Sequence, residues 1–244
     1  MYDWPELSKA TSEFWECIRD AFIAAEFDAP AQLTGNAEAN DHWLHSNLIF
    51  SQTCGYPYAV DLGENVDLLG TPIYDVEGCG KGTYSSAIVV SENSRFQKMD
   101  DTRGSVLVFN GESSLSGYRS LSPMVNDITV WFDEQIHSGS HRNSAKMVAD
   151  GIGDLAAIDA VCWALLKQYA PNVASRLRVL AWTAELPALP YISCKSQSPD
   201  EFISKTLALR AGVNQAIESG ATKPLMIKGL ADIDKADYMS LAEL

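Results

Sequence analysis

The chain has 244 residues, of which 46% are hydrophobic and 20% are charged. This length suits one large domain or two lobes of roughly 100–150 residues each. The formal net charge is -14, and a surface this acidic repels the phosphate backbone of nucleic acids. No basic cluster, basic helix or zinc-finger spacing offsets that repulsion. We therefore expect no nucleic-acid partner, and any bound anion must be held by local donors.

The sequence contains no run of about 18 apolar residues, so no direct insertion into a membrane is expected. Residues 1–5 read Met-Tyr-Asp-Trp-Pro, without the basic and apolar segments of a secretory leader. Read literally, this beginning predicts a cytoplasmic protein. A removed leader or an upstream start would instead permit export.

The five cysteines do not form a metal or redox motif. The odd count argues against a complete disulfide framework, and no C-x-x-C pair is present. Cys54 and Cys79 each lie beside a glycine in a predicted loop. They are the one pair that an oxidising compartment would be expected to join. We expect neither a metal nor a cofactor.

The first part of the chain combines helical and strand-like patterns. Phe14, Ile18 and Phe22 recur at helical spacing and predict a helix over residues 8–27. The next predicted elements, in chain order, are a short helix over 36–45, strands over 48–50 and 66–69, a glycine-rich loop over 75–82 and a strand over 86–90.

The middle of the chain alternates regularly between strands and helices, which is typical of a parallel α/β layer. The tail adds further α/β signals. The predicted elements are a strand over 105–109, a helix from about 114, a strand over 134–137, a helix over 140–150, a strand over 155–158, a helix over 159–169, a strand over 178–182, a strand over 189–193, a helix over 199–217 and a short helix near the end.

Two extended stretches, near residues 88–92 and 181–185, are the predicted hinges between two lobes. They divide the chain into a discontinuous first lobe, residues 1–88 and 185–244, and a continuous second lobe, residues 89–184. The sequence thus predicts a two-lobed α/β protein that holds its ligand in a cleft between the lobes.

Small polar residues begin three predicted helices of the second lobe, directly after strands. They are Ser113, Ser114 and Ser116, then Ser140 and His141, then Asp159. Ligands of open parallel sheets bind beyond the carboxyl ends of the strands. Helix N-termini there offer free N–H groups and a partial positive charge, which together favour an anion. The alternative interpretation is that serine and aspartate serve only as N-caps.

Four residues, two in each predicted lobe, have two open interpretations. His141 is either a donor to an anion, as imidazolium, or a surface histidine. Asp159 either caps its helix or accepts a proton borne by the ligand. In the first lobe, Thr53 and Tyr74 either close over the ligand as donors or belong to ordinary turns.

Several short motifs, taken in order, resemble the phosphate/phosphite/phosphonate substrate-binding proteins of ABC transporters. The resemblance runs from about residue 2 to residue 195. The motifs are Gln52-Thr53-Cys54-Gly55-Tyr56-Pro57, Gly70-Thr71-Pro72 with Tyr74-Asp75, Ser114-Leu115-Ser116-Gly117-Tyr118, Gly139-Ser140-His141-Arg142, Ala156-Ala157-Ile158-Asp159 and Leu180-Ala181-Trp182-Thr183.

The resemblance implies a periplasmic-binding-protein-like fold of type 2 and reversible binding of a phosphate- or phosphonate-type anion. Ser114, Ser116 and His141 match residues that hold the head group in that family, and Tyr74 matches a tyrosine of the other lobe. Leu115 departs from the pattern, because a hydroxyl residue often stands there. The implied partners are a small anion and a transporter permease, and the implied location is the periplasm.

Two rival functions remain open. Cys54 and His141 would be the nucleophile and base of an enzyme, but no third orienting residue and no nucleophile-elbow motif accompany them. A ligand-sensing regulatory protein is the second rival. We expect a binding protein without catalytic residues.

Overall fold

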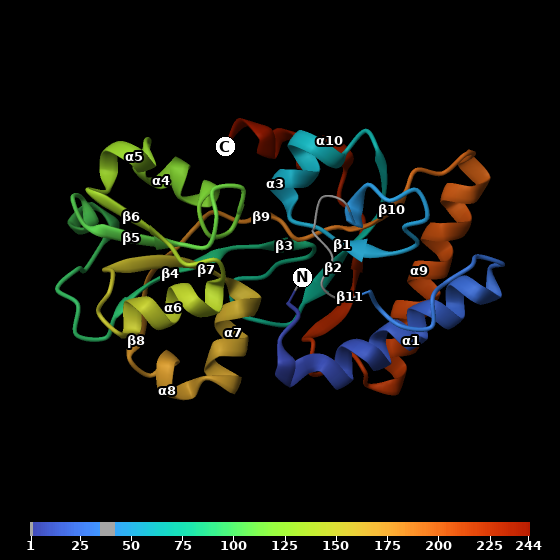
Figure 1. Cartoon of the computed structure of the whole chain (residues 1–244), viewed down its shortest axis with the longest axis horizontal. Coiled ribbons are helices and arrows are strands. Elements are labelled where there is room, and N and C mark those ends of the chain that lie inside the picture. The colour runs from blue at the N-terminus through green and yellow to red at the C-terminus, as the bar shows by residue number, and fades with distance from the viewer. Residues whose placement is uncertain (1, 35–41) are drawn as a thin grey trace. The chain divides into compact units, whose positions relative to one another are not determined.

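The computed structural model of the protein describes residues 2–34 and 42–244, so most of the helix predicted over 36–45 lies outside the described residues. The chain forms two compact units (Figure 1). Unit 1 comprises Met1–Asp75 and Pro187–Ala242, and unit 2 comprises Val76–Leu186 with Glu243–Leu244. Each unit has its own β-sheet.

The first boundary between the units differs from the predicted one. A boundary at residue 88 would cut β4 (Ser86–Ser91), which pairs along its length with β7 (Leu155–Asp159) and β8 (Leu177–Trp182). All of β4 therefore belongs to the sheet of unit 2, and the crossing between the units lies earlier, after Asp75. The second boundary, at Leu186/Pro187, lies two residues after the predicted one.

The sheet of unit 1 is antiparallel, with strand order β1-β10-β2-β11. Its strands are β1 (Ser51–Gln52), β10 (Tyr191–Cys194), β2 (Val66–Tyr74) and β11 (Ile227–Ala231). The strand predicted over 66–69 is longer than predicted, since β2 continues to Tyr74, and the interpretation of Tyr74 as part of an ordinary turn was wrong. The first half of β2 pairs with β10 and the second half with β11, so the strand changes partner at Gly70–Thr71.

Two long helices cover unit 1. Helix α1 (Ser8–Ala24) packs against α9 (Pro199–Ser219), and Gly212 permits the close approach, because a Cβ there would lie 2.7 Å from the Ile18 Cα. The shorter helical elements are η1 (Pro5–Leu7), α3 (Gly55–Pro57), η2 (Tyr58–Leu62, a π-helix), α10 (Lys235–Met239) and η5 (Ser240–Glu243).

The sheet of unit 2 has strand order β6-β5-β7-β4-β8. Strand β5 (Val106–Phe109) runs parallel to both β6 (Glu134–His137) and β7, as predicted. Strand β4, which precedes the predicted parallel layer, lies between β7 and β8 and is antiparallel to both, so β7 and β8 run in the same direction. A separate two-stranded sheet joins β3 (Thr83–Tyr84) to β9 (Leu186–Pro187).

Both faces of the unit 2 sheet are covered. Leu107, Phe109 and Leu155 belong to a core that also contains the buried side chains of residues 118–132. That segment carries η4 (Arg119–Leu121), α4 (Ser122–Val125) and α5 (Ile128–Trp131). The other helices of unit 2 are α6 (His141–Ala149), which contacts β4, β5 and β7, α7 (Ala160–Tyr169), α8 (Pro171–Ala174) and η3 (Met99–Thr102). This packing fixes the strand ends that carry the candidate site.

Candidate functional site

The carboxyl ends of three parallel strands meet at one edge of the unit 2 sheet. Phe109 of β5 is in register with His137 of β6, and β7 ends at Asp159 beside the start of β4. Parallel pairing therefore gathers the segments that follow these strands, as the sequence predicts. These segments carry the serines, His141 and Asp159.

The segment after β5 does not begin a helix, so that prediction was wrong. Residues 111–118 form consecutive turns, and the first helical residue is Arg119. The Arg119 N–H donates to Ser114 O at 3.0 Å and the Ser120 N–H donates to Leu115 O at 2.8 Å, which closes wide turns instead of helical ones. The fully buried Leu115 side chain anchors this loop in unit 2. Tertiary packing thus overrides the local helical signal.

This loop still presents donors. The Ser114 Oγ accepts a hydrogen bond from the Gly117 N–H at 3.1 Å. Within residues 2–34 and 42–244, the backbone N–H groups of Leu115 and Ser116 donate no hydrogen bond. Ser113 is exposed, and Ser116 is buried. The loop therefore offers N–H groups that donate no hydrogen bond, next to serine hydroxyls, although no helix begins there.

The second segment does begin a helix. Ser140 is the N-cap of α6, and its Oγ accepts from the Asn143 N–H at 3.1 Å. The Ser138 Oγ donates to the Phe109 carbonyl at 3.0 Å and lies 2.6 Å from the Ser144 Oγ. These bonds tie the start of α6 to the end of β5. The N-cap role proposed as an alternative for Ser140 is thus confirmed, and its contact with a ligand stays a prediction.

His141 and Ser116 come together from the two segments. The His141 Nε2 lies 2.9 Å from the Ser116 Oγ. The His141 Nδ1 is closed off from solvent and has no hydrogen-bond partner in the described part of the chain. Burial lowers the pKa of His141 to about 4, and the nearby Ala157 carbonyl opposes this to a smaller extent without meeting the geometry of a hydrogen bond to the Nδ1. The imidazole is therefore neutral at pH 7 without a ligand, and the imidazolium expected from the sequence requires an anion beside it.

Asn110 is a site residue that the sequence analysis did not identify. Its Oδ1 is buried and has no hydrogen-bond partner among the residues that the structure describes. A Cβ on Gly117 would lie 1.8 Å from that oxygen and 3.1 Å from the His141 Cε1. Gly117 is therefore required for Asn110 and His141 to lie where they do. The sequence signal that could have identified Asn110 is its position directly after a strand and seven residues before Gly117.

Asp159 caps α7 from the end of β7. Its Oδ1 accepts from the Val161 N–H at 2.8 Å and the Cys162 N–H at 3.1 Å. The carboxylate is nearly fully buried. The capping interpretation is confirmed, and a contact with a ligand proton stays a prediction.

In unit 1, Thr53 and Tyr74 share a neighbour in Gln52. The Gln52 Nε2 donates to the Tyr74 hydroxyl at 3.0 Å and to the Leu189 carbonyl at 3.1 Å. Thr53 is fully buried, and its hydroxyl donates to the Cys54 carbonyl at 3.3 Å. Tyr74 is also buried and ends β2. Gln52, which the sequence analysis quoted only within a motif, links these two residues.

Comparisons with known proteins decide the family. Residues 47–238 match the family model described as ABC transporter, phosphonate, periplasmic substrate-binding protein. The chain belongs to this family. Its members are substrate-binding proteins and not enzymes. No curated protein was found to be similar to the chain in sequence.

Solved structures share the two-lobed periplasmic-binding-protein-like fold. XAC2383 from Xanthomonas citri, bound to ATP, has a TM-score of 0.75 at 16% identity over 98% of this chain and 93% of that chain. PhnD1 from Prochlorococcus marinus, in complex with methylphosphonate, has a TM-score of 0.75 at 15% identity over 97% and 92%. PA3383 from Pseudomonas aeruginosa, a binding protein component of an ABC phosphonate transporter, has a TM-score of 0.68 at 17% identity over 92% and 78%.

The two residues of the enzyme alternative lie in different units of this phosphonate-binding family member. Cys54 is buried in unit 1, whereas the His141 Nε2 contacts Ser116 in unit 2. Cys17, Cys162 and Cys194 are free thiols, and a pairing of Cys54 with Cys79 stays a prediction. Among the described residues, no group of three histidine, cysteine or acidic side chains is arranged to hold a metal. None of the described helices has the length and apolar character needed to cross a membrane.

Proposed function

We propose that the chain reversibly binds a small phosphate- or phosphonate-type anion, as the binding component of an ABC-type uptake system or a related solute sensor. The supporting observation is the group formed by Ser116, His141 and Asn110 at the edge of the unit 2 sheet. Two of its buried polar atoms, the His141 Nδ1 and the Asn110 Oδ1, lack a partner among the described residues. Such atoms are rare in folded proteins and cost about 1–3 kcal/mol each.

The chemistry of this group suits a tetrahedral oxyanion that carries a proton, because the Asn110 Oδ1 can only accept a hydrogen bond while the other groups donate. With a net charge of -14, the chain repels anions at long range, so the binding free energy must come from local donors. The unengaged N–H groups of Leu115 and Ser116 supply two donors. The Ser116 hydroxyl supplies a third when the His141 Nε2 carries the proton and donates to the Ser116 Oγ.

An anion in this position favours the protonated histidine nitrogen and raises the pKa of His141 from its low value. Binding and proton uptake are therefore coupled below pH 6.5. The hydroxyls of Ser113, Ser114 and Ser140, on the same two segments, are proposed as further contacts to the anion. Asp159 is the proposed acceptor for a proton on the ligand, which fully ionised sulfate lacks.

We further propose that Thr53 and Tyr74 of unit 1 complete the contacts when the protein closes on its ligand. Hinge closure of this kind shifts the population toward the closed form only if the ligand makes contacts there that the open form lacks. The transporter permease is the proposed protein partner.

A ligand screen tests the function. Thermal shifts would be measured with phosphate, phosphite, methylphosphonate, 2-aminoethylphosphonate and sulfate. ATP belongs in the set, because XAC2383 was solved with ATP bound. A ligand at 100 times its Kd adds about 2.7 kcal/mol to the free energy of unfolding. A stabilisation by a phosphorus oxyanion that sulfate does not match supports the proposal. Equal responses to all of these compounds would contradict it.

A further inference from the structure

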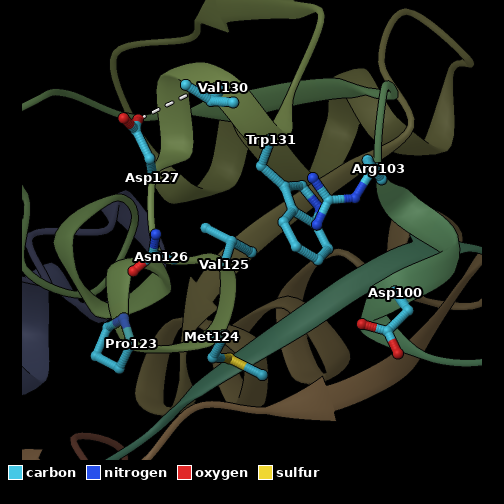
Figure 2. Close-up of a pocket in the computed structure, with 9 residues that line it drawn as sticks. All are labelled: Asp100, Arg103, Pro123, Met124, Val125, Asn126, Asp127, Val130 and Trp131. Atoms are coloured by element: carbon cyan, nitrogen blue, oxygen red, sulfur yellow. Dashed lines mark hydrogen bonds between the residues drawn. The ribbon is translucent and has the colours of Figure 1, made fainter.

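The hollow of unit 2 drawn in Figure 2 is lined by charges that offset one another. It has a volume of about 330 Å³. The guanidinium of Arg103 lies against the ring of Trp131, with its carbon 3.9 Å from the ring centre. Asp100 and Asp127 line the same hollow and offset the charge of Arg103. This hollow therefore indicates no ligand class, in contrast to a cluster of reactive side chains in unit 1.

Lys205, on α9 of unit 1, is a buried lysine. Its side chain is 2% exposed, and a lysine is almost never fully buried unless it is paired. The Lys205 Nζ donates to the Glu201 Oε1 at 2.8 Å, one turn earlier in the helix, and to the Cys194 carbonyl at 3.1 Å. These two bonds hold the nitrogen at the end of β10.

The third neighbour of this nitrogen is a thiol. The Lys205 Nζ lies 3.7 Å from the Cys194 Sγ. Cys194 is the last residue of β10, and it is a free and partly exposed cysteine. Its backbone is fixed, because its N–H donates to the Leu48 carbonyl at 2.7 Å and it pairs with Val66 of β2. An amine nitrogen and a sulfur are thus held side by side at a place that a small solute can approach.

Two other free cysteines lack such a neighbour. Cys162 is buried in unit 2, whereas Cys17 on α1 is partly exposed, as Cys194 is. Among the residues that the structure describes, no lysine nitrogen contacts the sulfur of either one. Glu201 compensates the charge of Lys205, so the position of the nitrogen, and not its charge, distinguishes Cys194 from Cys17.

We propose that Cys194 and Lys205 are a modification site, at which a peroxide induces a reversible sulfur–nitrogen bond between the two side chains. In the first step, the Cys194 thiolate attacks one oxygen of hydrogen peroxide. An S–O bond forms, the O–O bond breaks, and the departing hydroxide takes up the proton of the thiol to form water. The sulfur is oxidised by two electrons to a sulfenic acid, and the peroxide is reduced.

In the second step, the amine captures the oxidised sulfur. The Lys205 Nζ transfers one proton to the Glu201 carboxylate, 2.8 Å away, and its flexible stem lets it cover the 3.7 Å to the Cys194 Sγ. An S–N bond forms, the S–O bond breaks, and the departing hydroxide takes a second proton from the nitrogen and leaves as water. The product is a sulfenamide, the bond that a sulfenic acid also forms with a backbone nitrogen.

The link protects the thiol. It consumes the sulfenic acid before a second peroxide converts it to the irreversible sulfinic acid. Attack of an external thiol on the sulfur breaks the S–N bond and restores both Cys194 and Lys205, while the external thiol is oxidised. This inference does not depend on the proposed anion site of unit 2.

Peptide mapping of the full chain tests the inference. The protein would be treated with hydrogen peroxide, its remaining thiols blocked with iodoacetamide, and the product digested with trypsin without reductant. Trypsin cleaves the unmodified chain after Lys195, Lys205 and Arg210. The link blocks cleavage after Lys205 and joins residues 179–195 to residues 196–210. We expect this linked species in the mass spectrum, about 2 Da lighter than the two peptides together, and its loss after treatment with dithiothreitol.

Lys205→Arg is the matched variant, because it keeps the positive charge beside Glu201 but offers no amine. Dimedone, which traps sulfenic acids, should label Cys194 at least about fivefold more in this variant than in the parent. Cys17 is the internal control and should be labelled equally in both proteins. If the variant does not fold, the peptide map of the parent decides alone.

Three results would overturn the inference. The first is a parent protein in which dimedone labels Cys194 but no linked species forms. The second is a Cys194 that stays reduced while Cys17 is oxidised. The third is a Cys194 that is joined to another cysteine instead of to Lys205.

Discussion

The His141 Nε2 lies 2.9 Å from the Ser116 Oγ, although the two residues are 25 positions apart and follow different strands. The parallel pairing of β5 and β6 brings their segments together. The protonation of His141 decides which of the two groups donates in this contact. It is the basis of the first prediction.

Binding of an anion should draw a proton from solution between pH 4 and 6.5. The pKa of His141 is lowered to about 4 in the folded protein from its ordinary value of 6.5, so the free protein carries a neutral imidazole in this range. An adjacent anion raises that pKa. Calorimetry at pH 5.5 in two buffers of different ionisation enthalpy should give different binding heats, and His141→Gln should remove the difference. Equal heats for the parent would contradict the prediction.

The same low pKa should make the free protein lose stability as the pH falls. The unfolded chain binds the His141 proton near pH 6.5 and the folded chain only near pH 4, so the contribution of the neutral imidazole is complete above 6.5 and declines toward 4. Urea unfolding of parent and His141→Gln at pH 7, 5.5 and 4.5 measures this. The free energy of unfolding should decline less steeply in the variant. Parallel declines would show that other groups are responsible.

Gly117→Ala should disturb both folding and binding. The new Cβ would lie 1.8 Å from the Asn110 Oδ1 and 3.1 Å from the His141 Cε1, so Asn110 must move. We expect a loss of about 1–3 kcal/mol of stability, as in other overpacked sites. Gly111→Ala is the control, because its Cβ would meet nothing nearer than the His137 Nε2 at 3.9 Å. Chemical unfolding that finds both variants equally stable would refute this view of Gly117.

Asp159→Asn should alter selectivity more than stability. An asparagine Oδ1 still accepts the Val161 and Cys162 N–H groups that Asp159 caps, so the helix should keep its start. Loss of the carboxylate should reduce the discrimination between a protonated phosphonate and sulfate, which carries no proton. The ratio of the two dissociation constants measures this. An unchanged ratio would show that Asp159 does not read a proton on the ligand.

Tyr74→Phe should weaken ligand binding without altering the unit 2 contacts. It removes the hydroxyl that accepts from Gln52, while Gln52 keeps its bond to the Leu189 carbonyl. If the Tyr74 hydroxyl reaches the ligand, the Kd should rise by about tenfold, the effect of one lost hydrogen bond to a charged group. Tyr58→Phe, a change at another buried tyrosine of unit 1, is the control. Identical constants for both variants would exclude Tyr74 from the site.

The sequence predicted those parts of the site that depend on local chemistry. Ser140 and Asp159 cap their helices as serine and aspartate ordinarily do, and the strands that precede them are short apolar runs. The helix predicted at Ser114 failed because the burial of Leu115 is a tertiary effect. Asn110 was missed for a similar reason, since its lack of a partner becomes visible only when Gly117 is packed against it.

The domain boundaries also depend partly on local sequence and partly on tertiary pairing. The apolar run at residues 86–90 predicts a buried strand, and the structure confirms it as β4. The run itself does not reveal which sheet it joins. Its pairing with β7 and β8, which lie about 70 to 90 residues later in the chain, places it in unit 2 and moves the first boundary to Asp75/Val76.

The most direct test of the proposed anion site is calorimetric titration of Ser116→Ala and His141→Ala with the best ligand of the screen. Each lost donor to a charged group should weaken binding by about tenfold or more. Ser175→Ala, an exposed serine of unit 2, is the matched control and should bind like the parent. Circular dichroism would verify that the variants fold. If folded Ser116→Ala and His141→Ala bind as tightly as the parent, these residues do not hold the anion and the proposed site is wrong.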